Sequence, residues 1–376
     1  MKITGIICEY NPFHLGHRKQ FERIRAQIGE ETGIVCLMSG NYVQRGHPAI
    51  ADKSLRARAA VQCGADLVLE LPVTVSLSSA EGFAEGGVAI LGHFCDYLSF
   101  GSESADAQGL MDTARALLSP EFPEKLRVYL DQGLSFPAAR QAALGTDLLT
   151  KPNDILAAEY CKAILAQDSS MKPLVIPREG GYHDSAADPE NPSATSLRTL
   201  MEAQEDWQQY MPQEAAACLE GAALHALAHG ERAILARLRT MSDVDFEALP
   251  YGTEGLWRKF MHAARKYATV EEILTATKSK RYTRSRLDRM LMCAFLGITE
   301  EMRTAPVPYA RVLALNDRGR QILNRARQTG CFPNTGESTG HPYELLEQRC
   351  EDLYGLFATV PEAPGTGKTR RVVYCR

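Results

Sequence analysis

The sequence predicts an α/β fold, with a Rossmann-like parallel sheet domain followed by a second, mainly α-helical domain. Two observations predict this organisation. From the N-terminus to about residue 200, short apolar runs alternate with helical stretches, a pattern typical of a parallel sheet covered on both faces. Beyond about residue 205, alanine-rich amphipathic segments dominate and strand signals nearly vanish. We therefore expect one domain over residues 1–205 and another over residues 206–376.

The expected elements of the first domain follow each other as strand and helix. Strands are predicted at residues 3–7, 34–38, 66–71, 97–100 and 174–176, and helices at residues 18–27, 52–63, 80–91 and 105–118. Residues 120–167 are expected to form an insertion of helices broken at Gly133, Pro137 and Pro152. A ligand of such a fold lies outside the carboxyl ends of the strands.

The segment after residue 180 leads into the second domain. Residues 180–192 are rich in Gly, Asp, Asn and Pro and are expected to form a loop, and the next helix begins with Ser193 or Thr195 as its N-cap. In the second domain, helices are predicted at residues 214–238, 255–267, 270–276 and 285–296. The C-terminal segment carries weaker signals.

The composition is that of an ordinary globular protein. The chain has 376 residues, of which 45% are hydrophobic and 23% are charged. Its ten cysteines are scattered and often lie in apolar runs, so we expect buried thiols in a reducing compartment. No signal peptide and no membrane-spanning stretch is expected, which favours a cytoplasmic protein without a membrane partner.

The first predicted strand runs into a loop with two histidines, His14 and His17, separated by Leu15 and Gly16. A strand, a turn and a helix start in this order point backbone N–H groups and two imidazoles at one place, which suits a phosphate chain. Alternatively, the two histidines cap a helix or lie on the surface. No Cys-x-x-Cys or His-Glu-x-x-His string accompanies them, so we expect no metal site here.

Several strings together resemble the bacterial tRNA(Met) cytidine acetate ligase family, which belongs to the superfamily of His-x-Gly-His nucleotidyl transferases. The resemblance covers residues 1–200 most clearly. It rests on residues 9–17 and 66–72, and on Met38-Ser39-Gly40, Gln44-Arg45-Gly46, Phe100-Gly101-Ser102-Glu103, Lys151-Pro152-Asn153, Gly180-Gly181-Tyr182-His183-Asp184 and Ala194-Thr195-Ser196-Leu197-Arg198. Residues 280–286 and 311–313 extend it. His47, where an acidic residue is expected, and the tail after about Cys331 depart from the family.

The resemblance implies a nucleotidyl transferase domain that uses ATP, with Mg²⁺, to convert acetate to acetyl-adenylate. The acetyl group then passes to the 4-amino group of the wobble cytidine of elongator tRNA(Met), giving N4-acetylcytidine. The implied catalytic residues are His14 and His17. The implied nucleotide-binding residues are Ile7, Cys8, Glu9, Tyr10, Asn11, Pro12, Phe13, His14, Leu15, Gly16, His17, Arg18, Lys19, Gln20, Gly101, Asn153 and Arg178.

The expected chemistry is charge neutralisation during attack on the α-phosphorus of ATP. His14 and His17 would donate hydrogen bonds to phosphate oxygens, and Arg178 and Arg198 would form a cationic clamp. Each of these arginines has the alternative of a solvated position. Asn153 is alternatively a helix N-cap and Gly101 a turn residue. His183 with Asp184 is either a general base pair or a local hydrogen-bonded turn.

A basic stretch stands out in the second half of this acidic chain, whose net charge is −4. Its residues either bind RNA phosphates, with one tyrosine stacking on a base, or form a solvated helix face. They are Lys278, Lys280, Arg281, Tyr282, Arg284, Arg286 and Arg289. We expect RNA, and not DNA, as the polyanion.

Two rival functions stay open at the level of sequence. One is a nucleotidyl transferase of the same superfamily that acts on a small metabolite, which shares the histidine loop but needs no basic helical domain. The other is a tRNA- or nucleotide-binding protein without catalysis, against which the intact His14 and His17 argue.

Overall fold

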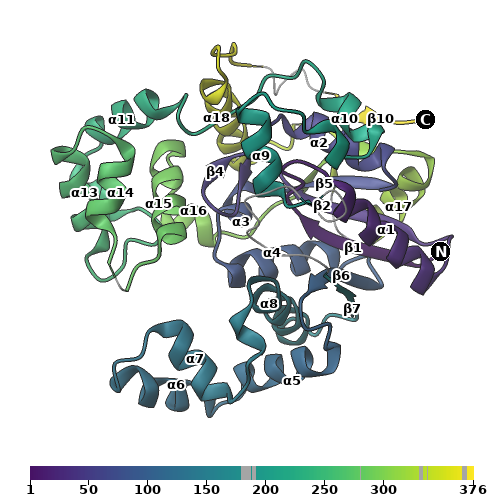
Figure 1. The fold of residues 1–376 in the computed structure, drawn as a ribbon, viewed down its shortest axis with the longest axis horizontal. Coiled ribbons are helices and arrows are strands. Elements are labelled where there is room, and N and C mark those ends of the chain that lie inside the picture. Colours follow the sequence, from purple (N-terminus) through teal and green to yellow (C-terminus); the bar gives the residue numbers. More distant parts are fainter. Residues whose placement is uncertain (179–187, 189–191, 280, 330–332, 337, 366–370) are drawn as a thin grey trace.

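The computed structural model describes residues 1–178, 188, 192–279, 281–329, 333–336, 338–365 and 371–376. Its centre is an eight-stranded sheet with the order β10-β8-β5-β2-β1-β6-β7, in which β9 pairs with β8 (Figure 1). The strands are β1 (Ile3–Cys8), β2 (Gly33–Ser39), β5 (Leu67–Leu71), β6 (Tyr97–Ser102), β7 (Lys172–Pro177), β8 (Ala310–Leu315), β9 (Pro333–Asn334) and β10 (Val373–Tyr374). The short strands β3 (Tyr42–Val43) and β4 (His47–Pro48) form a separate hairpin.

The five strands of the main sheet that come from the first 177 residues are parallel, which confirms the predicted parallel sheet. β1 pairs with β2 from Ile3↔Gly33 to Cys8↔Met38, and its other neighbour is β6. The carboxyl ends of β1, β2, β6 and β7 consequently meet at one edge of the sheet. The loop with His14 and His17 starts at this edge.

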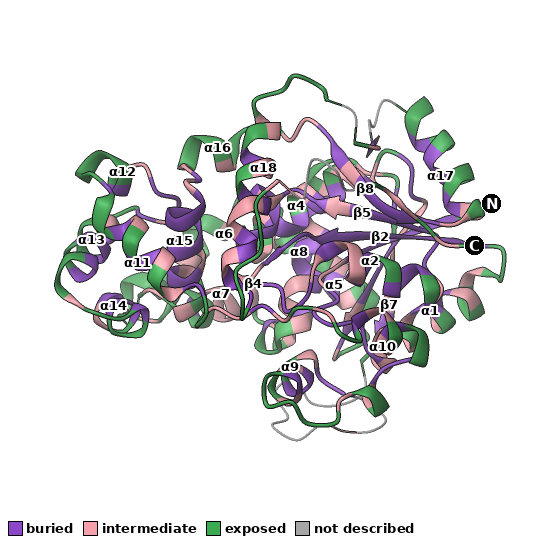
Figure 2. Ribbon diagram, turned by 90° about the horizontal axis from the view of Figure 1, so that it is seen from above, coloured by how far each residue is buried: buried purple, intermediate pink, exposed green. Residues whose placement is uncertain are grey.

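The helices of this part are α1 (Leu15–Ile28), α2 (Lys53–Gln62), α3 (Val73–Ser76), α4 (Ala80–Leu91), α5 (Ala107–Leu118), α6 (Phe122–Asp131), α7 (Phe136–Leu144), α8 (Pro152–Ala166) and α9 (Ala194–Glu202). They cover both faces of the sheet (Figure 2). Ile7 faces a core with α4, α5 and α8, whereas Ile6 faces a core with α1, α2 and α9. Successive side chains of a strand point to opposite faces, so both cores are built from the same strands.

Side-chain caps fix where several of these helices begin. Asp52 accepts a hydrogen bond from the Ser54 N–H at 2.8 Å at the start of α2. Ser193, and not Thr195, is the N-cap of α9, because the Ser193 hydroxyl accepts from the Ser196 N–H at 3.1 Å. Such caps satisfy backbone donors that the first turn leaves unpaired.

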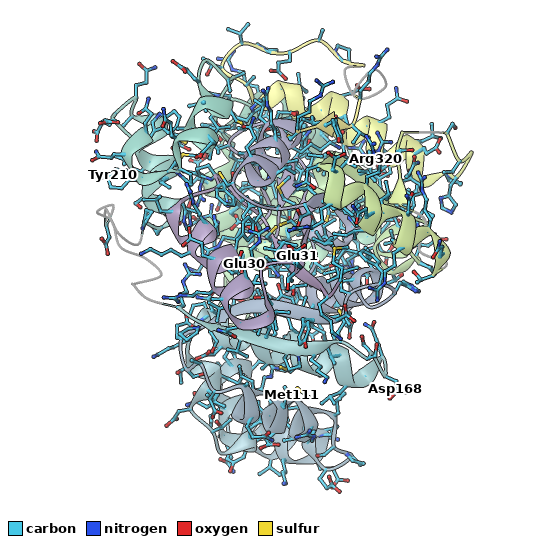
Figure 3. The ribbon with its side chains drawn as sticks, turned by 90° about the vertical axis from the view of Figure 1, so that its right-hand side faces the viewer. Glu30, Glu31, Met111, Asp168, Tyr210 and Arg320 are labelled. Carbon is cyan, nitrogen blue, oxygen red and sulfur yellow. The ribbon has the colours of Figure 1, made fainter. Side chains whose placement is uncertain are left out.

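The helices α5, α6 and α7 extend away from the sheet (Figure 1). In a side view, Met111 on α5 lies in the lower part of the molecule and Arg320 in the upper part, with Glu30 and Glu31 at a height between them (Figure 3). No helix within the described ranges has the length and apolar character that crossing a membrane requires.

Most of the second half is helical, as predicted. Its helices are α10 (Gln213–Leu219), α11 (Glu231–Thr240), α12 (Asp243–Glu247), α13 (Leu256–Lys266), α14 (Val270–Thr277), α15 (Arg284–Leu296), α16 (Glu300–Thr304), α17 (Asp317–Gln328) and α18 (Tyr343–Tyr354). Helices α11 to α15 share a hydrophobic core of their own, which α18 joins. They form a helical group beside the sheet (Figure 1).

The prediction of one helix over residues 214–238 was wrong. The chain forms α10 and α11, and between them Gly221 has a left-handed backbone with φ of 69°. The N–H of His225 donates to the Ile50 carbonyl, and that of Ala226 donates to the Phe357 carbonyl. These distant partners replace the helical hydrogen bonds in this interval.

The prediction that strands nearly vanish after residue 205 was also wrong. β8 lies in the main sheet, antiparallel to β5, and Leu67 pairs with Leu315. The side chain of Asn316 donates to Asp66 Oδ1 at 3.0 Å and so ties the end of β8 to the start of β5. The part of the chain after residue 309 thus returns to the first domain. The boundary near residue 205 stays a prediction.

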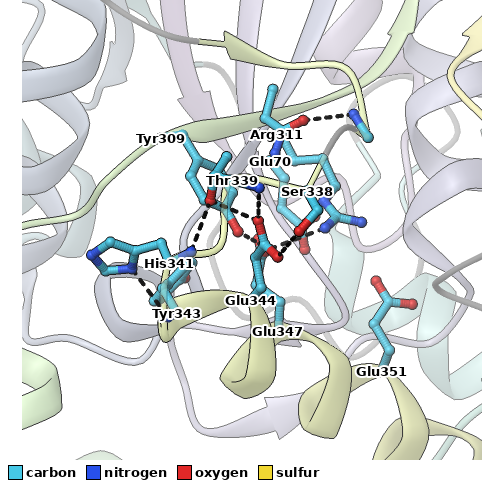
Figure 4. Close-up of polar contacts among 12 residues, drawn as sticks. Glu70, Tyr309, Arg311, Ser338, Thr339, His341, Tyr343, Glu344, Glu347 and Glu351 are labelled. Atoms are coloured by element: carbon cyan, nitrogen blue, oxygen red, sulfur yellow. Dashed lines mark hydrogen bonds and ion pairs between the residues drawn. The ribbon is translucent and has the colours of Figure 1, made fainter.

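A buried network of charges holds α18 against the sheet. Lys53 Nζ lies 2.7 Å from both oxygens of Glu70 and also pairs with Glu351 of α18. Beside it, Arg311 of β8 pairs with Glu347 at 3.1 Å (Figure 4). Burial alone would lower the pKa of Lys53, but the carboxylates of Glu351 and Glu70 outweigh burial and raise it. The ammonium group is therefore charged and holds the two carboxylates together.

Candidate active site

A cavity of about 630 Å³ opens where β1, β6 and β7 end. Many of the residues predicted to bind nucleotide line it: Ile7, Cys8, Glu9, Tyr10, Asn11, His14, His17, Gln20, Gly101, Asn153, Arg178 and Arg198. A smaller cavity of about 120 Å³ shares five of these residues and adds Gly16 and Lys19. The sheet thus brings together residues that are far apart in the sequence.

The loop between β1 and α1 is fixed by the packing of its aromatic residues. Tyr10 has a left-handed backbone with φ of 44°, which turns the chain from β1 toward α1. Its buried ring packs edge-on against Phe13, with centroids 4.9 Å apart, and lies 4.7 Å from the ring of His17. The imidazole of His17 therefore stands against an aromatic wall.

His14 and His17 cap the start of α1 reciprocally. His14 Nδ1 accepts from the Gly16 N–H at 3.1 Å, and His17 Nδ1 accepts from the His14 N–H, also at 3.1 Å. The two rings stack with centroids 3.6 Å apart and 26° between their planes. Because each Nδ1 accepts a hydrogen bond, a neutral ring carries its proton on Nε2. Capping and ligand binding are therefore compatible, since Nε2–H stays available as a donor.

Both imidazoles are held in the neutral form. Burial, with a smaller effect of Arg178, lowers the pKa of His14 to about 3. Burial also lowers the pKa of His17, followed by the effects of His14 and Arg178. The histidines can therefore donate hydrogen bonds at neutral pH but add no positive charge, which must come from other residues.

The lowered pKa of His14 predicts a pH dependence of stability. Below pH 6.5 the unfolded chain binds a proton that the folded chain excludes down to about pH 3, so stability is complete above pH 6.5 and falls with falling pH. In His14→Asn, the amide can keep the cap but does not titrate. Between pH 7 and pH 5, the free energy of unfolding of the native protein should fall by about 2 kcal/mol more than that of His14→Asn. Urea denaturation at both pH values checks this, and equal losses would contradict it.

Arg178 and Arg198 reach the cavity from β7 and α9. Arg178 Nη1 donates to Asn153 Oδ1 at 3.2 Å, and its charge acts on both histidines. Arg198 Nη1 donates to the carbonyl of Asn11 at 2.8 Å and so connects α9 to the histidine loop. Both guanidinium groups are thus in place to supply the charge that the neutral imidazoles lack.

In the structure, Asn153 is not a helix N-cap and Gly101 is not a turn residue. Lys151 is the N-cap of α8, and Asn153 follows it inside the first turn, where its side chain donates to Glu103 at 2.7 Å. Gly101 lies within β6 and does not turn the chain. An added Cβ at Gly101 would meet no atom within 4 Å, so this strand position faces open space.

Arg56 is a structural residue of the site that the sequence analysis missed. Its fully buried guanidinium donates to the carbonyls of Glu9 at 2.6 Å, Ser39 at 3.2 Å and Gly40. It thus joins the ends of β1 and β2. In the sequence, Arg56 is one basic residue of an amphipathic helix, and no local pattern distinguishes it.

Similarity to known proteins agrees with this geometry. Residues 1–362 match the family described as HIGH Nucleotidyl Transferase. The tRNA(Met) cytidine acetate ligase of Clostridium acetobutylicum is 34% identical over 373 residues, with 92% of each chain covered. That of Clostridium kluyveri is 36% identical over 370 residues, with 89% of each chain covered. The chain belongs to the tRNA(Met) cytidine acetate ligase family.

Solved structures extend the similarity to the whole fold of this family. The apo structure of Thermotoga maritima TmcAL covers 100% of both chains with a TM-score of 0.91 and 30% identity. A second structure of the T. maritima protein, bound with alpha-thio ATP, has a TM-score of 0.88 at the same identity and coverage. Membership of the tRNA(Met) cytidine acetate ligase family, predicted from the sequence strings, is confirmed.

Some predicted residues of the family's nucleotide loop line neither cavity. These are Pro12, Phe13, Leu15 and Arg18. Phe13 is buried in the core with Phe21, and Arg18 pairs with Glu22 and Glu214. The predicted pair His183 and Asp184 lies outside the described residues.

The residues predicted to bind RNA lie on and before α15, and several have protein partners. Lys278 and Arg281 are exposed, although Arg281 pairs with Glu254 at 2.5 Å. The Tyr282 hydroxyl donates to Glu254 at 3.2 Å. Lys280 lies outside the described residues. The exposed part of this basic stretch is therefore smaller than the sequence suggests.

The remaining three arginines of the stretch make contacts within the protein. Arg284 pairs with Glu271 and Asp288, and Arg286 donates to the Tyr251 carbonyl at 2.8 Å. Arg289 departs most from the predicted solvent-facing position. It lies over the ring of Tyr251 at 5.3 Å and donates to the Gln44 carbonyl at 3.4 Å. Helix α15 thus touches the β3–β4 hairpin at the cavity wall.

Proposed function

We propose that this chain is an ATP-dependent ligase of its family. It activates acetate as acetyl-adenylate and transfers the acetyl group to the 4-amino group of the wobble cytidine of elongator tRNA(Met). The observation that carries the proposal is the pair of neutral imidazoles that cap α1 beside two arginines at one cavity. The relatives named tRNA(Met) cytidine acetate ligase and the T. maritima structure bound with alpha-thio ATP support it.

In the first step, an acetate oxygen attacks the α-phosphorus of ATP, and the bond to pyrophosphate breaks. Nε2–H groups of His14 and His17 would donate to phosphate oxygens, and the backbone N–H groups at the start of α1 would add to them. Arg178 and Arg198 would offset the negative charge that moves to pyrophosphate. No protein nucleophile is needed, because the adenylate itself is the activated acyl donor.

Mg²⁺ would enter with the phosphates. Within the described residues, no group of three or more His, Cys, Asp or Glu side chains is placed to hold a metal ion. The described part of the protein therefore offers no complete set of its own ligands for a metal ion. Mg²⁺ commonly binds through substrate phosphates and water instead. When bound, the ion would neutralise phosphate charge.

The RNA would approach from the side of α15. Lys278 and Arg281 are exposed there, and α15 contacts the cavity wall through Arg289 and Gln44. Phosphate contacts of exposed basic residues give salt-dependent affinity. A tRNA substrate also fits a cytoplasmic location, and neither DNA nor a membrane surface has a role in the reaction.

The test uses the purified protein with ATP, radiolabelled acetate and total tRNA. We expect label in the cytidine of tRNA(Met), and AMP and pyrophosphate released in equal amounts. Label found only in a small metabolite would overturn the proposal in favour of another nucleotidyl transferase. Binding of ATP without turnover would favour a non-catalytic protein.

The open position at Gly101 gives a second test of where ATP binds. In Gly101→Val, the side chain would project into the cavity, so we expect the KM for ATP to rise about tenfold. The melting temperature should stay close to native. Gly5→Ala in β1 is the matched control, because its Cβ would meet Leu91 Cδ1 at 2.8 Å. It should lower the melting temperature and leave KM unchanged, and the reverse pattern would contradict the assignment.

A further inference from the structure

Tyr160 of α8 is a buried residue of the cavity wall that the first reaction step does not use. Its side chain lies in the protein interior, with 3% of the residue exposed, and its ring packs 5.4 Å from that of Phe100. Yet its hydroxyl has no hydrogen-bond partner among the described residues, and Tyr160 lines the cavity. A buried tyrosine hydroxyl normally finds a partner, so this one is available for a ligand.

Glu9, at the end of β1, lies close to Tyr160. Burial raises the pKa of Tyr160, and the neighbouring groups Cys8 and Glu9 raise it further. Glu9 Oε1 accepts from the Gln44 N–H at 2.7 Å, whereas no described residue donates to Oε2. Arg56 also binds the Glu9 carbonyl at 2.6 Å and so holds the backbone of Glu9 in place. The carboxylate above it keeps one oxygen to which no described residue donates.

Gln44 adds an unused donor to the same wall. Its Nε2 is buried without a hydrogen-bond partner in the described part of the chain, and Gln44 lines the cavity. Together, Glu9 offers an acceptor, Tyr160 a hydroxyl and Gln44 an N–H donor. This set is complementary to an exocyclic amino group next to a ring acceptor, as on the edge of cytosine, whose amino group pairs well with a carboxylate.

Two members of the set, Glu9 and Gln44, are joined by a hydrogen bond, whereas Tyr160 packs on Phe100 of β6 next to Gly101. Gly101 belongs to β6 and Arg178 follows β7, on one side of β1, whereas Gln44 lies between β3 and β4, after β2 on the other side of β1. The Gln44 loop also abuts α15, because a Cβ added at Gly46 would meet the backbone of Asp288 at 2.4 Å. This is the side from which RNA would arrive, so a cytosine can reach Glu9 and Gln44 from the side of α15.

We propose that Glu9 and Tyr160 bind the 4-amino group of the acceptor cytidine, and that Glu9 accepts its proton during acetyl transfer. This inference rests on the proposed function. The amino nitrogen attacks the carbonyl carbon of acetyl-adenylate, the C–N bond forms, and the bond between that carbon and the AMP oxygen breaks. The electron pair leaves with AMP, and the proton from nitrogen passes to Glu9 Oε2. The Tyr160 hydroxyl holds the amino group in line.

The test separates the two half-reactions in the full-length protein. In Glu9→Gln, transfer from preformed acetyl-adenylate to tRNA(Met) in a single turnover should fall about 100-fold or more. In Tyr160→Phe, transfer should fall about tenfold with the acetate-dependent exchange of pyrophosphate into ATP unchanged. Glu124→Gln on the exposed helix α6 is the matched control and should leave both steps unchanged.

A pH profile distinguishes proton transfer from a structural effect. In the native protein, the rate of transfer from preformed acetyl-adenylate should fall on the acidic side as a carboxylate is protonated, and Glu9→Gln should remove this limb. Equal loss of both half-reactions in Tyr160→Phe, or full transfer in both variants, would overturn the inference. If the native protein itself transfers no acetate to tRNA, the proposed function has failed instead.

Discussion

His17→Ala is expected to lower acetate-dependent pyrophosphate release by about 100- to 1000-fold. The variant loses the Nε2–H donor that would face the phosphates, and removing one such preorganised donor typically has an effect of this size. The loss should appear in the rate of the first half-reaction at saturating ATP, because the hydrogen bond strengthens as charge moves to pyrophosphate. Pyrophosphate release measured with and without acetate gives this rate.

The variant His17→Asn separates catalysis from capping. Its side-chain oxygen can still accept from the His14 N–H, as His17 Nδ1 does at 3.1 Å, but the shorter side chain places no donor at the position of Nε2. We expect a melting temperature close to native and an activity as low as that of His17→Ala. Near-native activity of His17→Asn would mean that His17 acts only as a cap.

Lys53→Met is expected to lower the free energy of unfolding by about 3–5 kcal/mol. The ammonium group of Lys53 lies between Glu70 of β5 and Glu351 of α18, and all three groups are withdrawn from water. Without it, two buried carboxylates lose the ammonium group that both of them contact. Chemical denaturation at pH 7 measures the loss, and hydrogen exchange should show weakened protection of α18.

The matched control for Lys53→Met is Lys2→Met. The exposed ammonium group of Lys2 lies 3.9 Å from Asp96, and a surface pair of this kind contributes less than about 1 kcal/mol. The free energy of unfolding of Lys2→Met should therefore be close to that of the native protein. If Lys53→Met and Lys2→Met lowered the free energy of unfolding by the same small amount, the buried network would not hold α18 to the sheet.

Local periodicity was sufficient for the parallel part of the sheet. The strands at residues 3–8 and 33–39 and the helix at residues 80–91 were predicted to within two residues, because their apolar patterns match the strand and helix repeats. The same reasoning missed β8, since this strand lies some 240 residues from its partner β5 in the sequence. A strand in an otherwise helical region is recognised only from its partner.

The residues of the candidate site also fall into those that were predicted from the sequence and those that only the structure reveals. His14, His17, Gly101 and Arg178 were predicted from the family resemblance and do line the cavity. The contribution of Tyr160 could not be predicted, because an aromatic residue on an amphipathic helix is usually part of the core. What marks it is a hydroxyl without a partner in the described structure, which is a property of its surroundings.

The sequence by itself determined the α/β class, the place of the histidine loop and the family, because each depends on residues close together along the chain. Only the tertiary structure decided the protonation of the two imidazoles, the burial of Lys53 between two carboxylates and the wall that Glu9 shares with Tyr160. These features depend on burial and on hydrogen bonds between distant segments, and both exist only once the chain has folded.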